Sequence, residues 1–172
     1  MDPMEKAKSE MSSLEQFVSK MPVVKGYREK EMRRETDKQI RDTLARRLEA
    51  RRRKISGLQG ELLSGGGLLW MDDIERVVGR LQLLIDRVKT ASYGYAPFFA
   101  LERVKEDDLD RLIEFDQKLF DELARLDEAI SGLEQAVAAN EKIKEAVQAL
   151  ADIAAALNET FSRRHEVIQG TA

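Results

Sequence analysis

The sequence predicts an all-α protein: an antiparallel up-down-up-down four-helix bundle with coiled-coil-like packing and a long first helix. Apolar residues recur at steps of three and four over four long stretches, and no stretch alternates as a strand does. A chain of 172 residues, 42% of them hydrophobic, is long enough for one core. We expect helices over about 27–63, 72–92, 106–138 and 141–168, forming a single domain over 27–172. Residues 1–26 are expected to form a loosely ordered N-terminal arm.

The first predicted helix runs from Tyr27 to about Leu63 without a proline. Its core face is predicted from six apolar residues at helical spacing: Ile40, Leu44, Leu48, Ile55, Leu58 and Leu62. The run Gly65 to Gly67 ends it, because glycine is costly in a helix and suits a turn. This helix is longer than the second, so we expect the overhang 27–37 to be covered by residues 94–105, by the arm or by a second copy of the chain, or to project as a solvated single helix.

The second predicted helix begins at Asp72, which we expect to cap it in a capping box with Glu75. Gly94 and Pro97 end it and open a long connection over 94–105. Its core face is predicted to comprise Ile74, Val77, Val78, Leu81, Leu84, Ile85, Val88 and Ala91.

The third and fourth predicted helices meet near Asn140, because the apolar residues after it no longer follow the heptad register of the third helix. We predict a tight hairpin there, with a kinked continuous helix as the alternative. The third helix has a heptad seam of Leu109, Leu112, Asp116, Leu119, Leu123, Leu126, Ile130, Leu133 and Val137. The fourth contributes Ile143, Val147, Leu150, Ile153 and Leu157, with Ala146, Ala149, Ala154 and Ala156 on its inner side.

Asp116 is the one acidic residue of that seam. Counting the helical rise from the two turns places it at the depth of Arg164 in the fourth helix and of Arg41 in the first. We therefore predict a structural ion pair of Asp116 with Arg164, Arg41 or both, which fixes register more than it adds stability. The alternative is a solvated carboxylate in a frayed seam.

The composition argues against several kinds of active site. The chain has no cysteine and a single histidine, His165, which has Ser162 where a di-iron bundle requires glutamate. The glycine run lacks the lysine and hydroxyl residue of a phosphate loop. We therefore predict a non-enzymatic protein with no cofactor, no metal and no small-molecule substrate. A charged N-terminus and the lack of a long apolar run favour a cytoplasmic location.

Charge is distributed unevenly. Residues 25–54 carry 13 basic and 6 acidic residues, whereas residues 55–172 carry 13 basic and 22 acidic ones. Within the basic segment, Arg47, Arg51, Arg52 and Lys54 form the candidate surface for an anion or a partner. Favourable i,i+4 pairs such as Asp42 with Arg46 and Glu49 with Arg53 reduce the free positive charge, so an intramolecularly paired or solvated face is the preferred interpretation.

Four aromatic residues, Tyr93, Tyr95, Phe98 and Phe99, gather in the long connection, and Trp70 precedes the second helix at the opposite end of the bundle. Such aromatics can anchor a partner, although plugging the open end of the core is the preferred interpretation. The sequence favours a scaffold or adaptor that binds another protein or a second copy of itself, and we expect a homo-oligomer. The alternative is a module that binds nucleic acid or an anionic membrane surface through the basic stripe.

Overall fold

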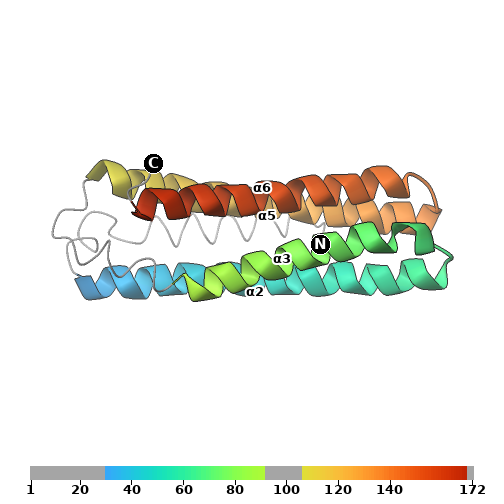
Figure 1. The fold of residues 1–172 in the computed structure, drawn as a ribbon, viewed down its shortest axis with the longest axis horizontal. Coiled ribbons are helices and arrows are strands. Elements are labelled where there is room, and N and C mark those ends of the chain that lie inside the picture. Colours follow the sequence, from blue (N-terminus) through green and yellow to red (C-terminus); the bar gives the residue numbers. More distant parts are fainter. Residues whose placement is uncertain (1–29, 92–105, 170–172) are drawn as a thin grey trace, which may run out of the picture.

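The computed structural model describes residues 30–91 and 106–169, and confirms the all-α fold (Figure 1). Within these ranges there is no strand. The elements are α2 (Lys30–Ser64), the 3-10 turn η2 (Leu68–Trp70), α3 (Met71–Thr90), α5 (Glu106–Ala139) and α6 (Ile143–Gln169). Their bounds agree closely with the predicted ones. The predicted arm 1–26 and the connection 94–105 lie outside the described residues.

The four helices form two hairpins packed side by side. In the sequence, α2 and α3 are joined by one short turn and α5 and α6 by another; across the hairpins α2 packs against α5, and α3 against α6. Two ion pairs join α2 to α5, Arg51 with Asp127 and Lys54 with Glu134. Residue numbers increase together along both helices, so α2 and α5 are parallel.

Direction alternates along the chain, as the colours of Figure 1 show. The consecutive helices α3 and α5 nevertheless occupy opposite corners of the bundle, because neither of them makes its main contacts with the other. The spatial order around the bundle is therefore α2, α3, α6, α5. Two of its four seams join parallel helices, a feature that hydrophobic periodicity alone does not specify.

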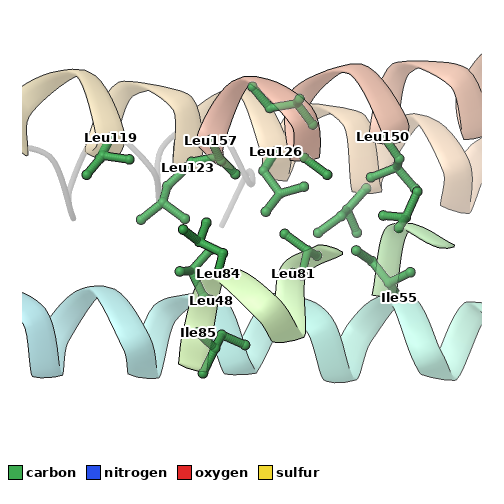
Figure 2. Close-up of a cluster of buried hydrophobic side chains, with 14 of the residues drawn as sticks. Leu48, Ile55, Leu81, Leu84, Ile85, Leu119, Leu123, Leu126, Leu150 and Leu157 are labelled. Carbon is green, nitrogen blue, oxygen red and sulfur yellow. The ribbon is translucent and has the colours of Figure 1, made fainter. Parts of the chain in front are cut away.

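The core is a continuous apolar layer between the hairpins. Figure 2 shows leucine and isoleucine side chains of α2 and α3 meeting those of α5 and α6, including Leu48, Leu81, Leu126 and Leu150. Most predicted core positions within the described side chains are buried, and Ile40, Val78 and Val137 are partly buried. Ala149 is exposed, so its predicted inward position is wrong.

Both interhelical turns end a helix in the same way. After α2, Gly66 has φ +86 and the Gly67 amide donates to the Leu62 carbonyl over 2.7 Å. After α5, Asn140 has φ 54 and the Glu141 amide donates to the Ala136 carbonyl over 3.1 Å. This is the Schellman arrangement, with a left-handed residue just past the helix. The Asn140 region is thus the predicted hairpin and not a kinked helix.

The predicted cap of the second helix is wrong. Helix α3 begins at Met71, with Trp70 preceding it and no side-chain cap. The chain leaves the glycine turn directly into the 3-10 turn, and the Met71 amide donates to the Leu68 carbonyl. Because helical hydrogen bonding is already continuous there, Asp72 lies inside the first turn and does not cap the helix.

Candidate functional site: a groove at the turn end of the bundle

Two of the four residues of the basic stripe singled out in the sequence form ion pairs with α5. Arg51, whose side chain is 12% exposed, forms an ion pair with Asp127 of α5 and donates to the Arg47 carbonyl over 3.0 Å. Lys54 pairs with Glu134 at 3.0 Å. The Arg47 guanidinium lies 5.4 Å from the centre of the Phe120 ring. This pairing agrees with the intramolecular interpretation of the stripe.

Arg52, the fourth residue of the stripe, is partly buried. Its Nε is buried and has no hydrogen-bond acceptor within the described part of the chain. Glu49 binds Lys89 of α3 instead of the expected Arg53, and this hydrogen bond holds the pKa of the Glu49 carboxyl below its ordinary value. Arg46 donates to the carbonyl of Asp42 over 3.3 Å and to Thr43, rather than to the Asp42 carboxylate.

The ion pair predicted between Asp116 and Arg164 is present. Arg164 donates through Nε to Oδ1 over 2.6 Å and through Nη2 to Oδ2 over 3.2 Å, a bidentate geometry. The Asp116 side chain is 17% exposed and the Arg164 side chain is 5% exposed. Arg41 is also buried, but its pairing with Asp116 stays a prediction.

Glu122 is a buried carboxyl that the sequence analysis did not identify. It is 4% exposed, and Thr160 of α6 donates to its Oε1 over 2.8 Å. Its Oε2 is buried without a hydrogen-bond partner among the described residues. Burial raises the pKa of Glu122 above its ordinary value, and the Thr160 hydrogen bond offsets part of this effect.

A groove of about 260 Å³ lies between α3 and α6 at the end where both helices begin. Its apolar lining consists of Trp70, Val77, Val147 and Ala151. Its polar lining consists of Asp73, Arg76, Arg80, Lys144 and Gln148. The groove follows one of the parallel seams, which explains why the first turns of two helices meet there.

The groove carries more positive than negative charge. Arg76 pairs with Asp73 at 2.7 Å. By contrast, Arg80 and Lys144 are exposed, and within the described residues neither side chain forms an ion pair. They project from different helices on the two sides of the groove. The arrangement can hold an anionic group between two cations above an apolar floor.

An exposed apolar tip adjoins the groove. The tip consists of Leu63, Leu68 and Leu69, whose exposed fractions are 52%, 70% and 77%. Leu68 and Leu69 form the 3-10 turn together with Trp70, which lines the groove. The exposed leucines and the groove are therefore linked through Trp70, which belongs to the same 3-10 turn and lines the groove.

Neither a metal-binding cluster nor a membrane-spanning helix is present among the described residues. No group of three or more histidine, aspartate or glutamate side chains in it is placed to hold a metal ion. None of its helices combines the length and apolar character needed to cross a bilayer. The predicted partner-binding aromatics Tyr93, Tyr95, Phe98 and Phe99 lie outside the described residues.

Comparisons with protein-family models, with curated proteins and with solved structures gave no match.

Sequence reasoning missed the groove because it depends on which helices are neighbours. A partial signal was present: Arg76 and Arg80 are four residues apart, on a helix whose core face is well defined. Lys144 joins them only because α6 packs beside α3, and no periodicity in either helix encodes that choice. The pair Leu68–Leu69 directly after a glycine run was the other available signal of an exposed apolar turn.

Proposed function

We propose that this chain is a non-enzymatic helical scaffold or adaptor that binds another protein at the turn end of its bundle. The observation that carries the proposal is the exposure of Leu68 and Leu69 beside the groove. Burying a leucine side chain contributes about 1.5–3 kcal/mol, so this pair can supply a binding hot spot. Trp70, next in the chain, extends the same surface with an aromatic side chain.

The turn presents these leucines in a defined conformation. The Gly67 amide donates to the Leu62 carbonyl, and the Trp70 amide donates to the Gly67 carbonyl over 3.1 Å. A Cβ on Gly67 would lie 2.8 Å from a Leu62 methyl carbon, so the turn packs tightly on α2. A preorganised turn loses less conformational entropy on binding, which favours affinity.

The alternative function, binding of nucleic acid or an anionic membrane through Arg47, Arg51, Arg52 and Lys54, is less well supported. Arg51 and Lys54 already contact carboxylates of α5. An external phosphate must displace those carboxylates or bind the few remaining donors, and stable phosphate binding needs several free cations.

Site-specific photocrosslinking tests the adaptor proposal. A photoreactive phenylalanine analogue replaces Leu69 in the full chain, expressed in its source cells. A matched probe replaces Leu83, which is 55% exposed on α3 away from the turn. We expect one defined protein adduct at position 69 and none at 83. The identified partner should then bind the purified chain with saturating stoichiometry, and Leu68→Ser should abolish that binding.

Two outcomes would count against this proposal. An adduct of twice the chain mass would show that the surface binds a second copy, giving a self-associating scaffold in place of an adaptor. Equal labelling at positions 69 and 83, together with a strictly monomeric mass by light scattering, would show that the tip has no specific partner.

A further inference from the structure

We infer that the groove between α3 and α6 binds an acidic segment of a partner protein, with carboxylates on its cationic rims and an apolar side chain on its floor. This inference rests on the proposed function and specifies the chemistry of the partner. The occupant is chosen by charge complementarity between the groove and the segment.

The rims supply the charge. Arg80 extends from α3 and Lys144 from α6, and neither is neutralised by a carboxylate in the described ranges. A carboxylate between them accepts charge-assisted hydrogen bonds from both helices. Arg76 is already paired with Asp73, so it contributes less free charge.

The floor supplies an apolar contact. Val77 comes from α3, Val147 and Ala151 come from the neighbouring α6, and Trp70 adds an aromatic side chain to the same lining. The volume of about 260 Å³ is below the roughly 300–1,000 Å³ of small-molecule pockets. It suits one or two side chains of a docked segment better than a whole cofactor or substrate.

The surrounding charge favours a protein over a nucleic acid. The whole chain has a net charge of −3. The exposed residues Asp72 and Glu145 lie in the first turns of α3 and α6, and the exposed Glu75 follows in the next turn of α3. An extended polyanion placed over the groove would meet these carboxylates as well. A short segment can place its few carboxylates on Arg80 and Lys144 alone, which selects an acidic peptide.

Trp70 makes the test direct, because it is the chain's single tryptophan and lines the groove. The probe is an aromatic-free amphipathic peptide of roughly 16 residues made of glutamate, leucine and alanine, long enough to form a helix. The comparison peptide replaces each glutamate with glutamine. Titration of the full chain is followed by Trp70 fluorescence and by calorimetry, at low and at physiological salt.

We expect saturable binding of the glutamate peptide that weakens with salt, and at least roughly tenfold weaker binding of the glutamine peptide. The double variant Arg80→Glu, Lys144→Glu should lose binding to a similar extent. Arg53→Glu, an exposed charge reversal on α2, serves as the matched control and should leave binding unchanged. Ala151→Met fills the floor and should weaken both peptides, while circular dichroism verifies that each variant remains helical.

Equal affinity for the two peptides would overturn the inference, as would a single-stranded DNA that binds as tightly and responds to the same variants. A photocrosslink at Leu69 that survives the Arg80→Glu, Lys144→Glu change would also overturn it. In that case the adaptor proposal stands and only the chemistry assigned to the groove fails.

Discussion

The ion pair between Asp116 and Arg164 gives the sharpest test of how the bundle fixes its register. The substitution Arg164→Met removes a guanidinium that makes bidentate hydrogen bonds of 2.6 and 3.2 Å. The methionine keeps an apolar side chain of similar length in the seam. The loss is therefore mainly that of a partner for the Asp116 carboxylate.

The expected magnitude follows from the burial of the two side chains. Breaking a fully buried pair costs about 3–5 kcal/mol, whereas an exposed pair contributes about 0–1 kcal/mol. Arg164 is 5% exposed and Asp116 is 17% exposed, so the pair lies nearer the buried limit, with some access of water to the carboxylate. We expect Arg164→Met to lower the free energy of unfolding by about 2–3 kcal/mol. In a chain of this length, that corresponds to roughly 5–10 °C in Tm.

Urea denaturation followed by circular dichroism measures the effect, with Arg163→Met as the matched control. Arg163 is the adjacent residue, and its pair with Glu159 at 2.6 Å is exposed, so its loss should cost below about 0.5 kcal/mol. The double variant Asp116→Leu, Arg164→Met should recover most of the lost stability. Equal costs for the two single arginine variants would refute the reasoning. A double-mutant cycle between Arg41 and Asp116 tests the pairing that stays a prediction.

Four further substitutions probe the buried carboxyl, the two turns and, as a control for the first turn, a glycine inside α2. Glu122→Gln should raise the free energy of unfolding by about 1 kcal/mol at neutral pH, because the neutral amide avoids the cost of burying the carboxylate charge. Burial raises the pKa of Glu122 in the folded state, so the carboxylate lowers the stability of the wild-type chain fully at pH values above that raised pKa and not at all below the ordinary value of 4.5. Urea titrations should therefore show that the stability gained by Glu122→Gln shrinks as the pH falls. Gly67→Ala should lower the free energy of unfolding by about 1–3 kcal/mol, because the added Cβ would press against Leu62 of the preceding helix. Gly57→Ala should raise it by about 0.5–1 kcal/mol, because a Cβ there meets nothing within 4 Å and alanine favours a helix. Equal effects of the two substitutions would contradict the turn geometry. Asn140→Gly should be neutral or stabilising by up to about 1 kcal/mol, because φ is 54 there, and a clear loss of stability would contradict the left-handed cap.

Much of this fold was predictable from hydrophobic periodicity, because each helix buries one continuous stripe. The prediction worked best where long apolar residues recur without interruption, as from Leu119 to Leu133. It failed at the start of α3, where a 3-10 turn replaces a side-chain cap. It also failed at Ala149, because an alanine contributes too little apolar area to decide which side of a helix is buried.

The candidate site was less predictable because it combines residues from two helices that are far apart in the sequence. The pair Asp116–Arg164 was accessible, since a short hairpin fixes the depth of one helix against the next. The groove residues Arg80 and Lys144 could not be paired from the sequence, because their proximity depends on α3 packing beside α6. That choice is made by the whole core and leaves no periodic signal in either helix.

The parallel seams also explain what happens to the uneven charge. Helix α2 carries much of the basic excess and packs beside the acidic α5, so Arg51 and Lys54 are neutralised within the molecule. The other parallel seam brings together α3 and α6, where Arg80 and Lys144 meet no such acidic partner in the described residues. A charge run in a bundle therefore marks a binding surface only when the neighbouring helix leaves it unpaired. This difference in pairing is the reason for proposing the turn-end groove, and not the more basic stripe on α2, as the docking surface.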